Sequence, residues 1–395
     1  MRILSVSSGY PEKKYRVKKI FAHEQNLEFI NQGCEVEVVN LGITEVNKSF
    51  EFYEGIKVFG FRKTGNNLSN VLKLKKILKK VFKNRNYDII LFNGLSANQY
   101  FYLDFFKSIT KYTAVIVHGT DGMIEKSAFK NYLRRRFLKK ADYIFPVSQY
   151  TDTLVAHLEK RTNDSVRKSK VISNGVNVNK FKYIKELTKV EIRDEFKISI
   201  DTFVVLTVCD LIERKGVDIL IKALSEYAKY NKDFLHIIIG RGNQEMLLKK
   251  YTTELKLDKN IRFIDYVEND SDLVKYYKLS DVYCMISKTQ YTPPNCEGFG
   301  ISYIEASYLG IPVIGGNNGG STTAIKHNFT GYLVDPYLDT CHLDISNYLT
   351  LLHKDKLEYE RISNNGKLMV LRDFTWNKNV KKILNTVNSY NADRL

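Results

Sequence analysis

The stretch SDVYCMISKTQYTPPNCEGFGISYIEASYLGIPVIGG, residues 280 to 316, contains the parts of one β-α-β unit. Its first apolar run predicts a buried strand, and the loop that follows ends in Gly-Phe-Gly. A helix is predicted from Ile301 to about Leu309, because Gly310 and Pro312 follow. The run IPVIGG predicts a second strand, parallel to the first. This pattern indicates an α/β fold with a parallel sheet.

The same alternation of strands and helices occurs along the chain in two series. The join is expected between the strand-like KVISNGV, residues 170 to 176, and a strand that begins near Thr202. Because 395 residues are many for one core, we predict two α/β domains. The predicted strands are the apolar runs MRILSVS, CEVEVVNL, YDIILFNG, TAVIVHG and ADYIFPVS, then DTFVVLTVCD, FLHIIIGRG, IRFIDYV, SDVYCMIS and IPVIGG.

The composition is that of a globular protein, with 44% hydrophobic and 27% charged residues. No segment reaches the roughly 18 apolar residues of a spanning helix, and the N-terminus lacks the pattern of a signal peptide. The five cysteines are scattered and show no metal-ligand spacing, so neither a disulfide framework nor a zinc site is expected. We expect a cytoplasmic protein.

The net charge of +17 is uneven along the chain. Residues 1 to 175 hold 31 Lys and Arg against 16 Asp and Glu, whereas residues 176 to 395 hold 30 against 28. This asymmetry indicates that the first half meets a polyanion such as a nucleic acid, an acidic glycan or an anionic membrane. The alternative is that the lysines only keep the protein soluble.

Two carboxylates accompany the glycines of the opening stretch. Glu297 precedes the predicted helix and Glu305 lies on it. Glycine lets backbone approach a ligand closely, and a helix N-terminus suits a phosphate. Two acceptors around an anion site fit a nucleotide sugar, which has hydroxyl groups on both sides of its phosphates. The alternative is that Glu297 caps the helix and Glu305 is solvated.

Three further turns follow predicted strands and are candidates for the same site. In VCDLIERKGVDILIKAL, residues 208 to 224, Arg214 and Lys215 could bind a diphosphate, or form an ordinary basic turn. In IIIGRG, Gly240 could border a nucleotide. In VIVHGTDG, His118 could contact a sugar hydroxyl or a developing positive charge, or be a structural histidine.

Together these motifs resemble the large family of retaining GT-B glycosyltransferases called family four. The resemblance spans nearly the whole chain in the family's order, and EGFGISYIEASYLG is similar to the version in bacterial enzymes that mannosylate lipid acceptors. The motifs that carry it are EGFGISYIEA, ISNGVNVNKF, LIERKGVDILIKAL, IIIGRG, ADYIFPVSQYT, HGTDG and the opening YP…FAHEQNLEFINQGCEVEVV.

The resemblance implies the GT-B fold, with two Rossmann-like doubly wound domains facing a cleft. Residues 1–176 would bind the acceptor, residues 177–377 would bind the nucleotide sugar, and residues 378–395 would form a helix that crosses back to the first domain.

The resemblance also implies roles for individual residues. Glu305 should bind the ribose hydroxyls, Glu297 the donor sugar, and Lys215 with Arg214 the diphosphate, while His118 should face the anomeric carbon. Further donor-binding residues are expected at Gly298, Phe299, Gly300, Ile301, Gly240 and Val267, and acceptor-side residues at Gly9 and Tyr10.

The chain departs from the family pattern in two places. Cys209-Asp210 stands where the family often has Gly-Arg, so one phosphate-binding arginine is missing and Arg214 could take its task. Thr322 and Thr323 follow Gly319-Gly320, where Pro-Glu is usual. The second departure puts the contacts of this loop in doubt.

The expected reaction is sugar transfer with retention from a UDP- or GDP-linked donor to a glycan or lipid-linked acceptor. Cations and backbone N–H groups would stabilise the departing diphosphate. No aspartate-rich metal motif is present, so no cofactor or metal is expected. The rival functions are a non-enzymic polyanion binder on a degenerate transferase fold, and a sugar-nucleotide epimerase or phosphorylase.

Two basic stretches bear on the acceptor. Residues 71–86 and 126–140 each hold seven Lys and Arg interleaved with apolar residues. Such amphipathic helices could lie on anionic lipid, or their apolar faces could pack on the sheet while the lysines are solvated. We expect peripheral contact with the inner face of the cell membrane, and we do not expect a nucleic acid partner.

Overall fold

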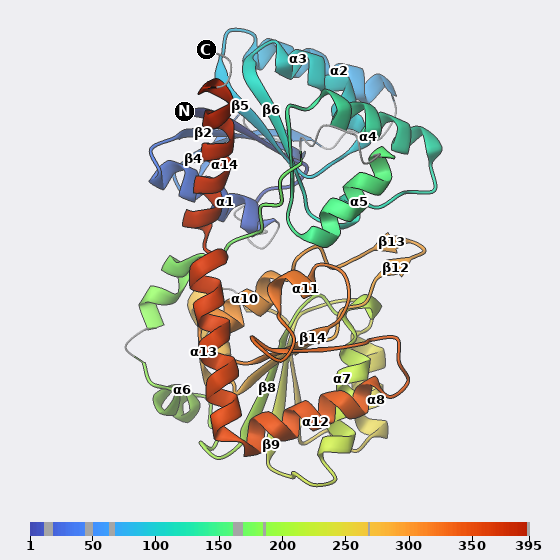
Figure 1. Cartoon of the computed structure of the whole chain (residues 1–395), viewed down its shortest axis with the longest axis vertical. Coiled ribbons are helices and arrows are strands. Elements are labelled where there is room, and N and C mark those ends of the chain that lie inside the picture. The colour runs from blue at the N-terminus through green and yellow to red at the C-terminus, as the bar shows by residue number, and fades with distance from the viewer. Residues whose placement is uncertain are drawn as a thin grey trace. The chain divides into compact units, whose positions relative to one another are not determined.

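The computed structural model describes residues 1–11, 19–43, 50–62, 68–160, 169–184, 187–267 and 269–392. The chain divides into two compact units (Figure 1). Unit 1 comprises Met1–Gly175 and Trp376–Leu395, and unit 2 comprises Val176–Thr375. The boundaries expected from the sequence, after residues 176 and 377, differ from these by one and two residues. The acceptor and donor roles of the two parts remain predictions.

Within its described residues, unit 1 is built on a seven-stranded sheet of order β3-β4-β2-β1-β5-β6-β7, in which only β3 runs antiparallel to its neighbour. The strands are β1 (Arg2–Ser7), β2 (Glu35–Ile43), β3 (Glu51–Tyr53), β4 (Ile56–Arg62), β5 (Tyr87–Asn93), β6 (Thr110–Val117) and β7 (Tyr143–Pro146). The helices are α1 (Ile20–Asn31), α2 (Leu68–Phe82), α3 (Tyr100–Lys107), α4 (Ala128–Lys140), α5 (Gln149–Glu159) and α14 (Trp376–Ala392), with 3-10 turns η1 (Ala97–Gln99) and η2 (Thr120–Gly122).

Helices cover both faces of this sheet. Buried residues of α2, α3, α4 and α5 form one apolar cluster with alternate residues of the strands. Helices α1 and α14 lie beside each other (Figure 1), and the indole of Trp376 donates a hydrogen bond to Glu24 at 3.0 Å. The C-terminal helix thus packs within unit 1, as a return to the first domain requires; its last residues, 393–395, lie outside the described part.

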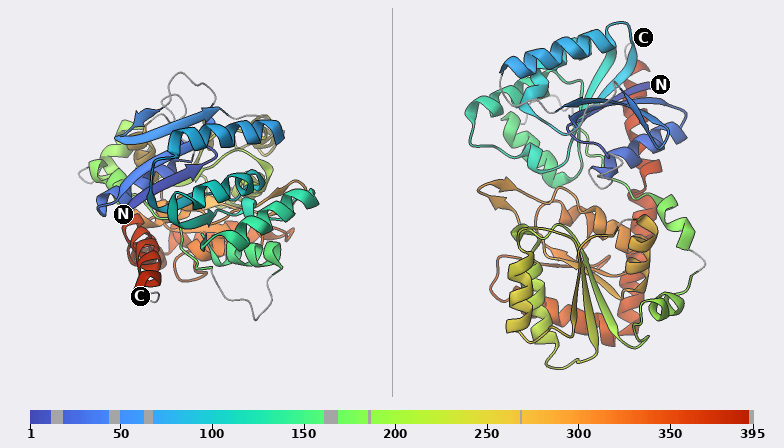
Figure 2. Two further views of the ribbon diagram at one scale, coloured as in Figure 1. Left: turned by 90° about the horizontal axis from the view of Figure 1, so that it is seen from above. Right: turned by 180° about the vertical axis from the view of Figure 1, so that it is seen from behind.

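Unit 2 is built, over its described residues, on a six-stranded parallel sheet of order β10-β9-β8-β11-β14-β15. Figure 2 (right) shows unit 2 from behind, with helices beside its strands. The strands are β8 (Phe203–Val208), β9 (Phe234–Ile239), β10 (Ile261–Ile264), β11 (Val282–Met285), β14 (Val313–Gly316) and β15 (Tyr332–Val334), with a separate hairpin β12 (Gln290–Tyr291) and β13 (Pro294–Asn295). The helices are α6 (Lys189–Glu195), α7 (Val217–Tyr227), α8 (Glu245–Glu254), α9 (Asp270–Leu279), α10 (Ile301–Tyr308), α11 (Ser321–Ala324), α12 (Cys341–Lys354) and α13 (Lys356–Asp373), with 3-10 turns η3 (Val178–Ile184) and η4 (Glu213–Lys215).

The prediction of two parallel-sheet α/β domains is confirmed, and α10 begins at Ile301 as expected. The segment KVISNGV, however, is not a strand. It makes two backbone hydrogen bonds to β7, from Lys170 to Ile144 and from Ile172 to Pro146. Pro146 has no N–H with which to return a bond, so no continuous ladder forms. The five cysteines are free thiols.

Candidate functional site

Glu297 lies at the centre of a charged cluster beyond the carboxyl ends of β8 and β11. Its Oε2 accepts hydrogen bonds from Nζ of Lys215 at 2.5 Å, from Nη1 of Arg214 at 3.1 Å, and from the hydroxyl of Ser287 at 3.3 Å. Burial alone would raise the pKa of Glu297, but Lys215 and Arg214 outweigh burial and hold that pKa at about 2. Because the carboxylate is ionised beside two cations, these three side chains carry one net positive charge.

The turn η4 brings both cations to this place. Gly216 ends the turn with φ of 62°, and a Cβ there would stand 2.2 Å from the backbone oxygen of Ile286. Only glycine permits such an approach to the end of β11. The buried Nε of Arg214 has no hydrogen-bond partner among the described residues. A buried N–H group without an acceptor is costly, so this donor is available to an anion.

The glycines before α10 have a packing role of their own. Gly300 has φ of 93°, and a Cβ on it would lie 2.4 Å from the ring of Tyr303. A Cβ on Gly320 would lie 2.0 Å from the oxygen of Gly298, because the loop after β14 crosses the start of α10. Phe299 is buried and its ring packs on Phe374 at 5.3 Å. Only the backbone of Phe299 can therefore meet a donor. Ile301 begins the helix, and in its first turn the amide of Tyr303 donates to the oxygen of Gly300 at 3.2 Å.

Glu305 is held by two donors rather than solvated. Nζ of Lys180 donates to Oε1 at 2.9 Å, and the hydroxyl of Tyr277 donates to Oε2 at 3.0 Å. Tyr277 is the first of three buried tyrosines whose rings meet in sequence, Tyr277 to Tyr283 at 5.9 Å and Tyr283 to Tyr303 at 5.7 Å. These rings pack α9 and α10 on the sheet beneath the carboxylate.

The remaining predicted donor residues sit on neighbouring turns. Gly240 follows β9 with φ of 150°, and a Cβ there would stand 1.8 Å from the oxygen of Cys209. Two backbone segments cross here so closely that only glycine fits at position 240. Val267 lies half-buried in the loop after β10. Asp210, which replaces the family arginine, is exposed, and burial raises the pKa of Cys209 to about 12, so the thiol is protonated.

Thr322 and Thr323 continue the loop in which the family pattern has Pro-Glu. The Thr322 hydroxyl donates to the oxygen of Gly319 at 3.1 Å, and the Thr323 amide donates to the oxygen of Gly320 at 3.0 Å. Both threonines therefore close the turn into α11 locally. The amide of Gly320 donates to the oxygen of Glu297 at 2.7 Å, which fixes this loop to the backbone of the charged cluster.

His118 belongs to unit 1, at the carboxyl end of β6. Its imidazole nitrogens are buried and have no hydrogen-bond partner among the described residues, and its ring lies 4.6 Å from that of Phe21. Burial, assisted by the Lys19 ammonium, lowers the pKa of His118 to about 3. The imidazole is therefore neutral at physiological pH, and it can exchange hydrogen bonds with a hydroxyl group.

Asp121 fixes the backbone around His118. One carboxylate oxygen accepts the amides of His118 and Gly119, and the other accepts the amide of Leu95, each at 2.8 Å. The loops after β5 and β6 are thereby joined through one side chain. Asp121 was not among the predicted site residues although it stands in HGTDG; an acid three residues after the histidine, able to cap a tight turn, was the available signal.

Gly9 and Tyr10 follow β1 in unit 1. The side chain of Tyr10 is fully buried, and its hydroxyl contacts Nδ1 of His23 at 2.8 Å, whose Nε2 contacts Glu54 at 3.0 Å. The Tyr10 side chain therefore points into the unit, and the acceptor-side role of Gly9 and Tyr10 remains a prediction. The backbone at Gly9 and Tyr10 is what could border an acceptor here.

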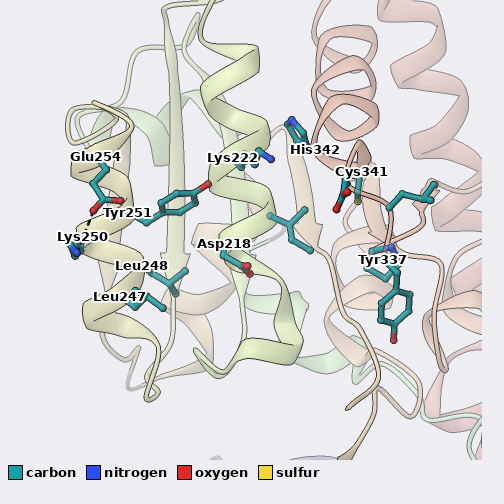
Figure 3. A pocket seen from close by; sticks show the side chains of 14 residues that line it. Asp218, Lys222, Leu247, Leu248, Lys250, Tyr251, Glu254, Tyr337, Cys341 and His342 are labelled. Carbon is teal, nitrogen blue, oxygen red and sulfur yellow. Dashed lines mark ion pairs between the residues drawn. The ribbon is translucent and has the colours of Figure 1, made fainter. Parts of the chain in front are cut away.

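A surface hollow of about 440 Å³ lies elsewhere in unit 2, between α7, α8 and the segment that leads into α12 (Figure 3). None of the predicted site residues lines it. Its charges are mixed, with Asp218 and Glu254 beside Lys222 and Lys250. Within the described part of the chain, no group of three or more His, Cys, Asp or Glu side chains could hold a metal ion. Metal-independent activity remains a prediction.

Two family models match the chain, one over most of each unit. The model described as "Glycosyltransferase Family 4" matches residues 20–180, and that described as "Glycosyl transferases group 1" matches residues 188–369. Together they extend over the α/β core of both units, which confirms the resemblance found in the motifs.

Curated relatives match over shorter lengths. A GDP-mannose-dependent alpha-(1-6)-phosphatidylinositol monomannoside mannosyltransferase of Mycobacterium tuberculosis is 31% identical over 147 residues, 37% of this chain and 38% of the relative. A GDP-mannose-dependent monoacylated alpha-(1-6)-phosphatidylinositol monomannoside mannosyltransferase of Corynebacterium glutamicum is 26% identical over 219 residues, 55% of each chain. The matches thus span about half or less of these relatives.

The fold is matched over the full length. A solved glycosyltransferase of Rickettsia africae has a TM-score of 0.79 and covers 98% of both chains, at 19% identity. At 19% identity this similarity is evidence for the fold alone. With two parallel-sheet α/β units and a family model matched to each, the chain belongs to glycosyltransferase family 4, the group 1 glycosyl transferases, and has the GT-B fold.

Proposed function

We propose that the protein transfers a sugar, with retention of configuration, from a nucleoside diphosphate sugar to a glycan or lipid-linked acceptor. The observation that carries the proposal is the cluster of Glu297, Arg214 and Lys215. It is buried, carries one net positive charge, and includes a guanidinium N–H without an acceptor among the described residues. Such a cluster suits the diphosphate, on which negative charge develops as the sugar leaves.

Other residues of the two units fit the rest of a nucleotide sugar. Glu305 would accept the two ribose hydroxyls, and Glu297 would accept a hydroxyl of the donor sugar through its other oxygen, Oε1. Backbone N–H groups from Gly298 to Ile301 would meet the phosphates at the start of α10. His118, neutral and without a partner among the described side chains, would accept or donate a hydrogen bond near the anomeric carbon.

GDP-mannose and a glycolipid are the first substrates to test, since the two curated relatives are named for GDP-mannose and a phosphatidylinositol mannoside. A thermal-shift screen of UDP, GDP and their sugars should show stabilisation by one nucleotide. Release of that nucleotide with acceptor, and a retained anomeric configuration in the product by NMR, would establish the reaction. Activity in EDTA would support transfer without a metal.

The rival functions give different results in the same assays. A polyanion binder on a degenerate fold predicts that Glu297→Ala keeps polyanion binding and that no donor releases its nucleotide. An epimerase or phosphorylase predicts turnover of the sugar nucleotide or of a glycan without transfer to an external acceptor.

We also propose that unit 1 contacts anionic membrane through α2 and α4. The apolar residues Val71, Leu74 and Leu78 of α2 are buried in the core, so they do not face lipid. The outer face of α2 instead presents lysines. Two exposed apolar residues lie among them, Leu72 at 46% and Ile77 at 49% exposure. None of the described helices is long and apolar enough to cross a bilayer.

Helix α4 presents exposed aromatic and basic side chains of its own. Phe129 and Tyr132 are 64% and 53% exposed beside exposed Lys130 and Arg136, while Leu133 is buried. Exposed aromatic rings among cations suit a membrane interface.

Liposome flotation tests the membrane contact. The protein should float with vesicles that contain phosphatidylglycerol and stay behind with pure phosphatidylcholine. Lys76→Glu with Lys80→Glu on α2 should weaken flotation, whereas Lys250→Glu on α8, an exposed lysine of unit 2, should not. If the protein floated to the same extent with both kinds of vesicle, that result would contradict the membrane contact.

A further inference from the structure

Lys180 forms a nearly buried ion pair with Glu305, and the proposed mechanism gives this lysine no role. Their side chains are 8% and 14% exposed, and Nζ of Lys180 lies 2.9 Å from Oε1 of Glu305. A second carboxylate, that of Asp270, lies 3.5 Å from the same ammonium but is 64% exposed. Of these two contacts the one to Glu305 is the stronger, since a buried pair is screened less than an exposed one.

Lys180 stands on η3, the first element of unit 2, and η3 is docked on α10 at two points. The next residue, Phe181, places its ring 5.0 Å from that of Tyr308. Glu305 and Tyr308 lie three residues apart, on the same side of α10. The ion pair and the ring contact thus hold η3 along the helix that carries the proposed ribose ligand, which fixes where the ammonium stands.

The two donors to Glu305 divide its oxygens between them. Lys180 occupies one acceptor site of Oε1 and Tyr277 one of Oε2. A carboxylate offers about four such sites, so each oxygen keeps one with respect to the residues that the structure describes. Two acceptors, one on each oxygen of a fixed carboxylate, match the two neighbouring hydroxyls of a ribose.

We propose that Lys180 is a positioning residue that orients Glu305 for the 2′- and 3′-hydroxyls of the donor's ribose. This inference rests on the proposed function, because it takes Glu305 as the ribose ligand. Lys180 holds the carboxylate in one orientation through a charge-assisted bond, and Tyr277 holds the second oxygen. Without the ammonium, the carboxylate loses a charged partner and turns, so that it no longer offers both acceptors to the diol.

A merely structural role for Lys180 predicts something else. If the lysine only fastened η3 to α10, its removal would lower the thermal stability and would weaken the binding of ribonucleotides and deoxyribonucleotides equally. Discrimination between ribose and deoxyribose separates the two roles, because only a change at the ribose ligand affects one sugar more than the other.

The experiment measures the affinity of the nucleoside diphosphate that the wild-type protein binds, UDP or GDP, and of its 2′-deoxy counterpart by calorimetry. Loss of a hydrogen bond to a charged group should make the wild type prefer the ribonucleotide by about tenfold or more. Lys180→Met should reduce that preference to about twofold, mainly by weakening the ribonucleotide. Lys180→Arg should keep most of it, because the guanidinium can reach the same oxygen.

Two further variants complete the design. Tyr277→Phe keeps the buried ring and removes the other donor, so it should reduce the preference in part. Lys275→Met makes the same chemical change on α9 at a lysine that pairs with Glu195, and it should leave the preference at the wild-type value. If Lys180→Met does not fold, Lys180→Gln and Tyr277→Phe give the same comparison.

The outcomes separate the inference from the function on which it rests. A wild-type protein that binds neither nucleoside diphosphate would reject the proposed function. A wild type that prefers the ribonucleotide, with Glu305→Ala losing that preference and Lys180→Met keeping it, would reject only the role of Lys180.

Discussion

Replacing Gly320 by alanine should displace the start of α10 from the charged cluster. The residue has φ of −73° and ψ of −10°, which any amino acid adopts, so the substitution adds no backbone strain. The new Cβ would stand 2.0 Å from the oxygen of Gly298, 2.2 Å from its carbonyl carbon and 2.5 Å from the nitrogen of Phe299. These are backbone atoms, and no rotamer change can relieve the contact.

The size of the displacement follows from the contact distance. Ordinary contacts begin at 3.4 Å, so the Gly298 oxygen must retreat by at least 1.4 Å, the difference from 2.0 Å. Overpacking of this kind costs about 1–3 kcal/mol of stability. A misplacement of about 1 Å in a binding site can cost about a hundredfold in rate, and we expect the affinity for the nucleoside diphosphate to fall with it. The 2.7 Å hydrogen bond from Gly320 to the oxygen of Glu297 would be broken as well.

Calorimetric titration with the bound nucleoside diphosphate and thermal unfolding measure the two effects in Gly320→Ala. Gly33→Ala is the matched control. Gly33 has φ of 81° and no atom within 4 Å of the position that a Cβ would take, so alanine there costs about 1 kcal/mol through strain alone. It should lower the unfolding temperature and leave nucleotide affinity unchanged. Affinity within threefold of wild type in Gly320→Ala would refute the close crossing of the two loops.

Three more substitutions test the electrostatics and the buried networks. Glu297→Gln should destabilise the protein at pH 7 by about 3 kcal/mol. The pKa of Glu297 is about 2 in the folded protein and 4.5 in the unfolded chain, so the stabilisation by the ionised carboxylate is complete above pH 4.5. The difference in unfolding temperature between wild type and variant, measured by calorimetry, should narrow as the pH falls toward 2. Asp121→Asn cannot serve all three backbone amides, so kcat/KM in the transfer assay should fall about tenfold to a hundredfold through loss of one to two hydrogen bonds that fix His118. Tyr10→Phe should cost about 1–2 kcal/mol in thermal unfolding, since His23 loses a buried partner, while KM for the acceptor stays unchanged because the Tyr10 hydroxyl points inward.

Elements that are buried on both faces could be predicted from the sequence, because their apolar runs are continuous. Strands β1, β8 and β9 are of this kind. The hairpin of β3 and β4 was missed, since its strands mix polar and apolar residues and its turn is Glu54-Gly55 rather than Asn-Gly. Both turn residues have positive φ, 44° and 82°, as this class of hairpin turn requires.

Some residues of the candidate site could likewise be predicted from the sequence, and others could not. Glu297, Arg214 and Lys215 could be found because each follows a predicted strand, and the carboxyl ends of parallel strands meet at one edge. The contact of Lys180 with Glu305 could not, because 125 residues separate the pair and no local period relates them. The inward orientation of Tyr10 depends on His23 and Glu54, which stand on other elements.

The charged cluster explains how the chain can lack the family arginine at position 210. Asp210 is exposed and contributes no cation, so in the proposed mechanism Arg214 and Lys215 supply the cationic side chains that meet the diphosphate. Both cations already share one oxygen of Glu297, and this buried carboxylate keeps them in place without a ligand, at a cost lower than that of two unpaired buried charges. A diphosphate carries more negative charge than one carboxylate, and Arg214 holds an additional buried N–H for it. The cluster is therefore already ordered without a ligand, as the proposed stabilisation of a leaving group without reorganisation requires.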